Sequence, residues 1–340
     1  MAKMALIPQN VAPIGSRRMG IYNEQGNRVG QIPLDGLTPP NPAKKRYSFG
    51  ALSDVHIVYN TATKDFEKAL TYLNNDEDVA FTCICGDLTD NGTAAQLAQY
   101  KAVVDAYSAD TPVYAIAGNH EAYASQPTLL EQYTGKPLYY SFTHGDDVFV
   151  MLGVISATEG NVFAEGELQW LYETLETNRN KRCFLFEHIP PVECCGDVLN
   201  IYSYTKLRDA QESVVFKSLL SHYKNLVFFH GHTHMKYYLQ EYGYKANYDN
   251  ECGCHSVHIP SLAVPRDVSG DTYTTVYADS EGYVVDVYEH GIHLRGRDFA
   301  YNNYEGRFLP IASYWLDTTL HTIPAGTYSD TTGTIKTQGA

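Results

Sequence analysis

Residues 228–234 read FFHGHTH, which places His230, His232 and His234 directly after the apolar run LVFF. A short apolar run is typical of a buried strand, and Gly231 permits the backbone to turn sharply where that strand would end. The histidines are therefore either metal ligands at a strand end or polar residues in an ordinary turn. This segment alone does not distinguish the two.

Four other segments have the same arrangement, in which polar side chains follow a short apolar run at once. In chain order these segments are Asp54-Val55-His56, Gly86-Asp87-Leu88-Thr89-Asp90, Gly118-Asn119-His120-Glu121 and His188-Ile189-Pro190-Pro191. In open α/β sheets, ligands bind at the carboxyl ends of the strands. Any one segment could be a turn, but five in succession indicate a single site built from five strand ends.

The hydrophobic spacing between these segments is helical. Residues 61–76 and 93–107 are predicted helices, and the second is expected to bury Leu97, Tyr100, Val104 and Tyr107 along one face. After residue 272, strand patterns follow one another without helices between them. This order predicts an α/β domain with layered sheets that are partly parallel and partly antiparallel.

The two ends of the chain differ in composition from the middle. Residues 1–45 are rich in Pro, Gly and Asn, with a possible hairpin around Gln25-Gly26-Asn27. We expect these residues to be an irregular arm that is ordered by packing on its own domain or on a partner. Residues 301–340 are rich in Thr and Gly and are either a final strand pair or a linker.

Composition limits the classes of function. The chain has 340 residues, 44% hydrophobic and 19% charged, with a formal net charge of −14. This charge argues against a broad basic surface for nucleic acid or anionic lipid, although a locally positive cleft could still attract an anionic substrate. No apolar run is long enough for a membrane span, and the N-terminus lacks the apolar region of a secretory signal. We therefore expect neither Sec-type export nor membrane insertion.

Seven cysteines are present, and four of them form two tight pairs, Cys194-Cys195 and Cys252-Gly253-Cys254. Neither spacing matches the usual pattern of a structural zinc site. A disulfide, a thiolate site and free loop thiols all remain open.

Together, the five segments resemble the signature of the calcineurin-like metallophosphoesterase superfamily, which is Asp-x-His, Gly-Asp-x-x-Asp, Gly-Asn-His-Asp/Glu, a lone His and Gly-His-x-His. The resemblance covers residues 46–300, with residues 1–45 as an arm and 301–340 as a β-rich extension. It implies a four-layer αββα sandwich of two mixed sheets, with a site for two divalent metal ions at the strand ends.

Carried over by position, the resemblance assigns three ligands to each metal ion and one ligand to both. The first ion would be held by Asp54, His56 and His234, the second by Asn119, His188 and His232, with Asp87 bridging. This mixture of imidazole, carboxylate and amide suits manganese, iron or zinc. The reaction implied is in-line attack of a metal-bridging hydroxide on a phosphate ester.

Two further residues take catalytic roles in the same resemblance. His120 would contact a phosphoryl oxygen or protonate the leaving group, and the carboxylate of Asp90 would orient His120. Candidate substrate contacts are Asn91, which directly follows the Gly-Asp-x-x-Asp segment, and His255 and His258, which follow the last ligands.

Departures from related branches narrow the activity. Serine/threonine protein phosphatases have an arginine where this chain has Asn91, and purple acid phosphatases have a tyrosine where it has Asp90. The pattern looks most like the phosphodiesterases, whose substrates include cyclic nucleotides, glycerophosphodiesters and phosphodiester polymers. We therefore expect a dimetal phosphoesterase, with a phosphodiester preferred and a cytoplasmic location.

The alternative is a structural or attachment subunit of a larger assembly, such as a phage tail component. Its phosphoesterase domain would then process a cell-surface polymer, or its activity would be incidental. The composition of both ends and the 28 tyrosines fit this reading, and the arm would then be the surface that joins an oligomer or a phage particle.

Overall fold

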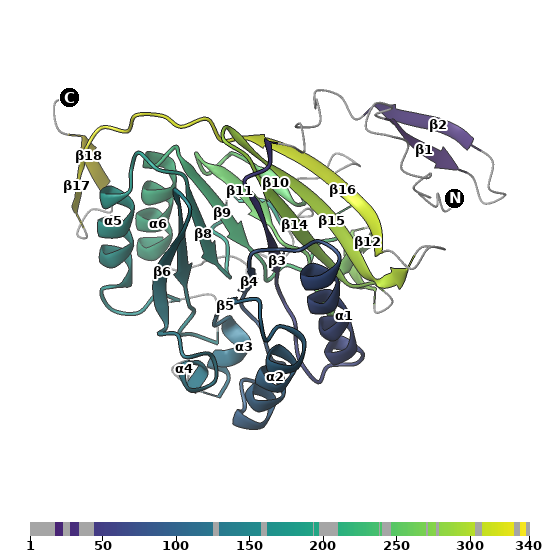
Figure 1. Cartoon of the computed structure of the whole chain (residues 1–340). Helices are drawn as coiled ribbons and strands as arrows, with labels where there is room; N and C mark the ends of the chain where they lie inside the picture. The colour runs from purple at the N-terminus through teal and green to yellow at the C-terminus, as the bar shows by residue number, and fades with distance from the viewer. Residues whose placement is uncertain are drawn as a thin grey trace.

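In a computed structural model, residues 18–22, 28–33, 44–124, 129–157, 162–192, 194–196, 210–237, 239, 246–269, 271–276, 279–302, 308–329 and 334–337 are described. Two six-stranded sheets lie face to face in the centre, with helices on their outer sides (Figure 1). This is the four-layer α/β sandwich that the sequence predicts.

The first sheet has the order β16-β15-β14-β3-β4-β5. Its strands are β3 (Tyr47–Leu52), β4 (Thr82–Cys85), β5 (Val113–Ile116), β14 (Glu281–Val287), β15 (Gly291–Asn302) and β16 (Phe308–Asp317). β3, β4 and β5 are parallel, whereas β14, β15 and β16 are joined by antiparallel pairs. The carboxyl ends of these three parallel strands therefore lie at the same end of the sheet.

The second sheet has the order β10-β11-β9-β8-β7-β6. Its strands are β6 (Tyr139–His144), β7 (Asp147–Leu152), β8 (Cys183–Glu187), β9 (Leu226–His230), β10 (Tyr248–Asp249) and β11 (His255–His258). β7, β8, β9 and β11 are parallel, and antiparallel strands close both edges. Both sheets are therefore mixed, as expected.

Aromatic side chains fill the space between the two sheets. Phe49 of the first sheet lies with its ring 5.3 Å from that of Phe149 and 5.4 Å from that of Phe184, both of the second sheet. All three are fully buried. Rings at these separations add edge-to-face attraction to the burial of apolar surface, which stabilises the contact between the sheets.

The helices cover the outer faces. α1 (Ala62–Asn75) and α2 (Ala94–Tyr107) pack on the first sheet, and α5 (Glu167–Thr177) and α6 (Ala210–His222) pack on the second. The short helices α3 (Asn119–Ala122) and α4 (Leu129–Thr134) follow β5. No helix in the described part of the chain is long and apolar enough to cross a bilayer.

The predicted buried face of α2 needs one correction. Leu97 and Tyr100 are buried as expected, but Val103 takes the third buried position, and Tyr107 is 41% exposed. Tyr107 ends the helix, where its main-chain oxygen accepts a hydrogen bond from Asn74 Nδ2 at 2.7 Å. The last turn of a helix can extend beyond the sheet that the helix covers. The hydrophobic repeat in the sequence does not show where the covered surface ends.

Both ends of the chain contain strand pairs. β1 (Arg18–Tyr22) and β2 (Arg28–Pro33) form the predicted antiparallel hairpin, although its turn at Gln25–Asn27 lies outside the described residues. β17 (Gly326–Ser329) pairs with β18 (Thr334–Thr337), so the C-terminal region is β-rich. β15 runs through residue 300, and the division of the chain at that position stays a prediction.

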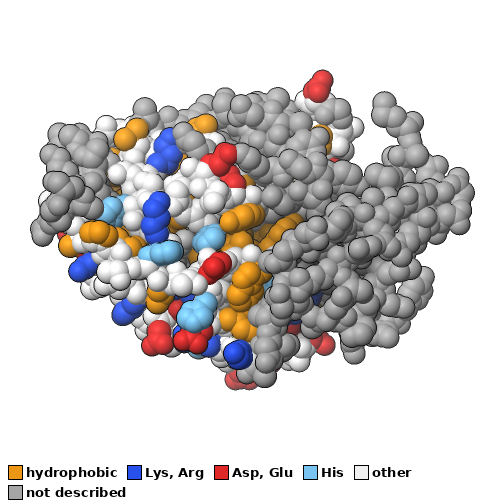
Figure 2. Space-filling view, turned by 90° about the horizontal axis from the view of Figure 1, so that it is seen from above, with side chains coloured by type: hydrophobic (Ala, Val, Ile, Leu, Met, Phe, Trp, Pro, Cys, Tyr) orange, Lys and Arg blue, Asp and Glu red, His pale blue; other side chains and the backbone are white. Residues whose placement is uncertain are grey.

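The two ends of the sandwich carry different side chains. The segments that follow β3, β4, β5, β8 and β9 meet at the end near α3, which lies low in Figure 1. The opposite end has a cleft bordered by Arg46, Lys181, Asp146 and Glu289. On the face seen from above in Figure 2, basic and acidic side chains lie interspersed.

Candidate metal centre

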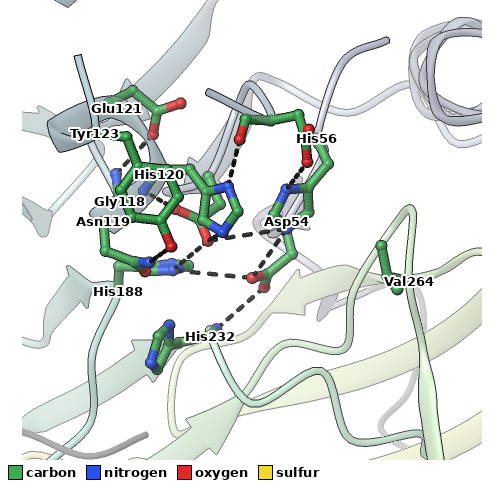
Figure 3. A network of polar contacts seen from close by, with 12 residues as sticks. Asp54, His56, Gly118, Asn119, His120, Glu121, Tyr123, His188, His232 and Val264 are labelled. Atoms are coloured by element: carbon green, nitrogen blue, oxygen red, sulfur yellow. Dashed lines mark hydrogen bonds and ion pairs between the residues drawn. The ribbon is translucent and has the colours of Figure 1, made fainter. Parts of the chain in front are cut away.

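The predicted ligands lie together at the strand ends, and Figure 3 labels five of them, Asp54, His56, Asn119, His188 and His232. Each follows the strand that the sequence assigns to it, at a distance of a few residues. Asp54 follows β3, Asp87 follows β4, Asn119 follows β5, His188 follows β8, and His232 and His234 follow β9.

The backbone of the ligand segments is strained. Asp54, His56, Asp87, His232 and His234 have φ values of 52°, 43°, 50°, 68° and 64°. This left-handed region is uncommon for residues other than glycine, and such strain persists at functional sites where the surroundings enforce it. Here the loops hold one another, because the His56 amide donates to the main-chain oxygen of Asp87 at 2.9 Å.

Two glycines allow the loops to approach this closely. A Cβ atom at Gly118 would lie 2.2 Å from Asp87 Oδ1, and one at Gly231 would lie 1.9 Å from Ser53 Oγ. Any side chain at either position would displace a neighbouring ligand segment. The glycines of the two motifs are therefore required by close approach rather than by the turn alone.

The first ligand group consists of Asp54, His56, Asp87 and His234, whose ligand atoms lie within 4.8 Å of one another. His234 Nε2 is 2.8 Å from Asp54 Oδ1, and His56 Nε2 is 3.8 Å from Asp87 Oδ2. Asp54 is fully buried, with its Oδ2 accepting a hydrogen bond from the Ser53 hydroxyl at 2.6 Å.

The second group consists of Asp87, His188 and His232. His188 Nε2 lies 3.0 Å from Asp87 Oδ2, and Asn119 lies beside them in Figure 3. Asp87 thus belongs to both groups, a position from which one carboxylate could contact two metal ions.

Main-chain carbonyls orient two of the imidazoles. His188 Nδ1 is 2.7 Å from the oxygen of Cys85, and His234 Nδ1 is 3.0 Å from the oxygen of Val264. A carbonyl can only accept, so the Nδ1 atoms carry the protons. The Nε2 atoms therefore face the centre as potential ligands, the usual arrangement around a metal-binding histidine.

His120 is oriented in the same way, which corrects the expected role of the Asp90 carboxylate. His120 Nδ1 lies 2.7 Å from the main-chain oxygen of Asp90, while the Asp90 carboxylate faces His56, with Oδ1 3.7 Å from Nδ1. The chain bends at Asp90 and Asn91, and this bend presents the carbonyl rather than the side chain to His120. His120 Nε2 lies 3.8 Å from Asp87 Oδ2.

Opposite charges dominate the electrostatics of the centre. Burial disfavours the charge of Asp54, but His234 and His188 hold the pKa of this carboxyl well below its ordinary value. Burial also opposes protonation of His188, yet Asp87 and Asp54 raise its pKa to about 10. The paired carboxylates thus attract positive charge to the space between the ligands.

The donor set fits two divalent cations. Asn119 Oδ1 and His56 Nε2 are buried and accept no hydrogen bond from the described residues. Buried polar atoms without hydrogen bonds are costly unless another partner compensates them. Imidazole, carboxylate and amide donors around a shared carboxylate suit manganese, iron or zinc.

Two residues without a predicted role join the site. Buried Glu121 accepts hydrogen bonds from the Thr89 amide at 2.9 Å and from the Gly118 amide at 2.8 Å, so it ties two ligand loops together. Burial and the nearby Asp87 raise the pKa of Glu121 to about 7. The position of Glu121 after Asn119-His120 in the motif was the only feature of the sequence that pointed to a role in the site.

The second of these residues is Tyr123, at the mouth of the site. Its hydroxyl lies 3.4 Å from Asn119 Nδ2, its ring centroid lies 4.5 Å from that of His120, and the residue is 48% exposed. One turn of helix separates it from Asn119, a spacing that is also common in sequences without a site.

The three candidate substrate contacts have different surroundings. Asn91 is exposed beside the centre, where its side chain donates to Asp90 Oδ2 at 2.9 Å. The structure does not bring His255 and His258 to the ligands. His255 Nε2 lies 2.8 Å from the Asp317 oxygen, and His258 is fully buried on β11, opposite His230 of β9. The His258 ring lies 5.5 Å from that of His230 because β11 lies beside β9 in the sheet.

Comparison with protein families gives a match over residues 47–236 to the model described as calcineurin-like phosphoesterase. Over 161 residues the chain is 31% identical to a protein of Arcobacter nitrofigilis named "Probable glycerophosphodiester phosphodiesterase GpdQ". This alignment covers 42% of the present chain and 56% of that protein. The chain therefore spans little more than half the length of the curated relative it matches.

Two solved structures share the fold. A purple acid phosphatase from yellow lupin (Lupinus luteus) seeds aligns with a TM-score of 0.56 at 14% identity, covering 88% of this chain and 59% of that one. GAP50, described as the anchor in the inner membrane complex of Plasmodium, aligns with a TM-score of 0.53 at 13% identity, covering 82% and 90%. At such identities, these similarities concern the fold alone.

Proposed function

Because this chain belongs to the calcineurin-like phosphoesterase family, we propose that it is a metal-dependent phosphodiesterase. The observation that carries the proposal is the position of Asp87, which lies in both ligand groups with His120 beside it. A carboxylate shared by two sets of histidines suits two cations held close together, and a protonatable imidazole next to them suits phosphate ester hydrolysis.

Each ion would be held as the resemblance implies. Asp54, His56 and His234 would hold one ion, Asn119, His188 and His232 would hold the other, and Asp87 would contact both. When bound, two such cations supply a water of lowered pKa and positive charge next to the phosphoryl group. We expect manganese, iron or zinc to support activity, with the choice set by availability as much as by affinity.

His120 would serve as the proton donor to the leaving group. Its Nδ1 is engaged by the Asp90 carbonyl, which leaves Nε2 directed at the centre. Burial opposes the charged form of His120, but the Asp87 carboxylate outweighs it and raises its pKa above the ordinary value. A raised pKa favours the protonated imidazole that general acid catalysis requires.

Two observations support a diester over a monoester. Asn91 is a neutral amide exposed beside the centre, whereas a guanidinium at this position would favour the more highly charged monoester. The relative from Arcobacter nitrofigilis bears the name of a phosphodiesterase. Substrate candidates are glycerophosphodiesters, cyclic nucleotides and phosphodiester polymers of the teichoic acid type.

The test compares hydrolysis of bis-p-nitrophenyl phosphate with that of p-nitrophenyl phosphate, with Mn²⁺ added and then with a chelator. We expect chelator-sensitive activity that favours the diester. A preference for the monoester would refute the diester assignment, and full activity in the chelator-treated, metal-free protein would refute the metal-dependent mechanism.

An assembly subunit such as a phage tail component is the second candidate. One observation favours it: among the described strands, β1 and β2 pair with each other as a separate two-stranded sheet. A hairpin of this kind is suited to packing on a partner. Mass measurement in solution tests the idea, because a chain that stays monomeric at high concentration would contradict it.

A further inference from the structure

Three buried thiols meet outside the metal centre. Cys252 and Cys254 flank Gly253 in the turn before β11, and their sulfur atoms lie 3.8 Å apart. Cys194, which follows the segment of His188, hydrogen-bonds with the Cys252 thiol. We call these three residues the thiol cluster. Each is at most 5% exposed, and none of them forms a disulfide bond.

The turn that carries two of the thiols is firmly placed. Gly253 has a φ of 91°, and a Cβ atom there would lie 2.8 Å from Ser221 Cα at the end of α6. Lys224 Nζ donates a hydrogen bond to the Gly253 oxygen at 3.0 Å. The cluster nevertheless lies close to the surface, because Glu251 in the same turn is exposed. A small oxidant therefore has only a short path to the sulfur atoms.

The arrangement favours a dithiol over a metal site. Within the described residues, the groups of three or more potential ligands whose atoms all lie within 4.8 Å of one another belong to the metal centre, and no such group includes these thiols. A thiolate metal site needs at least three sulfur or nitrogen ligands around one point. A disulfide needs only two sulfur atoms that can approach each other.

We propose that Cys252 and Cys194 form a redox pair, which closes a reversible disulfide when the protein meets a hydroperoxide. The Cys252 thiolate attacks the O–O bond, so that an S–O bond forms and the alcohol or water leaves with a proton. The Cys194 thiol then attacks the Cys252 sulfur, an S–S bond forms, and water leaves. In sum, two thiols give up two electrons and reduce one hydroperoxide to an alcohol and water.

The surroundings distinguish the attacking thiol from the resolving one. Hydrogen bonds from the Cys194 and Cys254 thiols lower the pKa of Cys252 to about 3, whereas burial raises the pKa of Cys194. A thiolate is the reactive form of cysteine. Cys194 is the better resolving partner because it comes from a separate segment. A Cys252–Cys254 bridge would close a ring of only three residues, which is hard to combine with a relaxed disulfide geometry.

The bridge would close next to the segment that carries two metal ligands. Gly196, two residues beyond Cys194, has a φ of 111°, and a Cβ atom there would lie 2.6 Å from Thr233 Oγ1. Thr233 stands between His232 and His234. Packed neighbours thus connect the thiol pair to the segment that carries these two ligands.

The experiment treats the full-length protein with tert-butyl hydroperoxide, blocks remaining thiols with an alkylating agent and maps cross-linked peptides by mass spectrometry. A Cys195→Ser background assigns the bridge to Cys194. We expect a Cys194–Cys252 cross-link that dithiothreitol reverses, that persists in Cys254→Ser and that is lost in Cys252→Ser. Cys183 is the matched control, because it is equally buried and burial raises its pKa to about 12.

Three results would overturn the proposal. These are a Cys252–Cys254 bridge as the main product, oxidation of Cys183 as fast as that of Cys252, and the absence of any bridge after peroxide treatment. If Cys252→Ser fails to fold, Cys194→Ser provides the second variant, which should accumulate sulfenic acid at Cys252 instead of the bridge. None of these readouts depends on phosphoesterase activity.

Discussion

Replacement of His120 by alanine tests how this imidazole acts. The variant would lose one side-chain hydrogen bond, from His120 Nδ1 to the Asp90 oxygen at 2.7 Å, and the contact of the His120 ring with Tyr123. Such a loss costs about 1 kcal/mol of stability, so the fold should persist. Loss of general acid catalysis costs about 10²–10⁴-fold in rate, which corresponds to about 3–5 kcal/mol in activation free energy.

The size of the loss should depend on the leaving group. A diester with an alkoxide leaving group, such as a glycerophosphodiester, needs the proton and should lose the full 10²–10⁴-fold in kcat. The p-nitrophenolate anion departs without protonation, so bis-p-nitrophenyl phosphate should lose less than about tenfold. Steady-state kinetics on both substrates, with metal content measured in parallel, make the comparison.

Equal losses on the two substrates would refute proton donation and indicate that His120 contacts a phosphoryl oxygen instead. The control variant is His290→Ala, because the side chain of His290 is 68% exposed in the turn between β14 and β15. It should retain full activity on both diesters.

Three further variants test individual contacts. Asp90→Asn should keep kcat within about tenfold because His120 contacts the main-chain oxygen of Asp90, and a loss as large as that of His120→Ala would contradict this. Glu121→Ala leaves buried amide donors unsatisfied and should destabilise the metal-free protein by about 2–5 kcal/mol in urea unfolding, whereas an effect below about 1 kcal/mol would argue against the tie between the loops. Burial opposes the charge of Glu77, but hydrogen bonds from Arg295 hold its pKa below the ordinary 4.5. The stabilisation from Glu77 is therefore complete above pH 4.5 and is lost as the pH falls through the lower folded-state value. Urea unfolding should show a deficit of about 1–3 kcal/mol for Glu77→Gln at pH 7 that shrinks in acid, and a deficit independent of pH would refute the assignment.

Much of the fold could be predicted because its strands and helices have clear hydrophobic repeats. The apolar strands that precede the ligand segments are buried on both faces, so their sequences read as continuous apolar runs. β6 did not give this signal, because most of its residues are only partly buried or are exposed and it lies at a sheet edge. Its pairing with β7 is a tertiary contact that local pattern does not contain.

The candidate site was predictable for side chains that follow a strand directly. Asp54, Asp87 and His188 closely follow strands β3, β4 and β8. Their positions could therefore be predicted from the predicted strands alone. The contact between Asp90 and His120 was different, because the choice between carbonyl and carboxylate depends on backbone angles within a turn. His255 and His258 were predicted as substrate contacts because they follow the last ligands in the sequence. This proximity does not reveal that β11 lies beside β9 in the sheet.

The most direct measurement is the metal content of the purified protein and of Asp87→Ala, loaded with Mn²⁺, desalted and analysed by mass spectrometry of the elements. Asp87 is the side chain that the Asp54–His56–His234 group and the His188–His232 group share. We expect two ions per chain in the parent protein and at most one in the variant, with diester hydrolysis lost in parallel. Two ions retained in folded Asp87→Ala, or a parent protein that is active with a single ion, would contradict a centre built on a shared carboxylate.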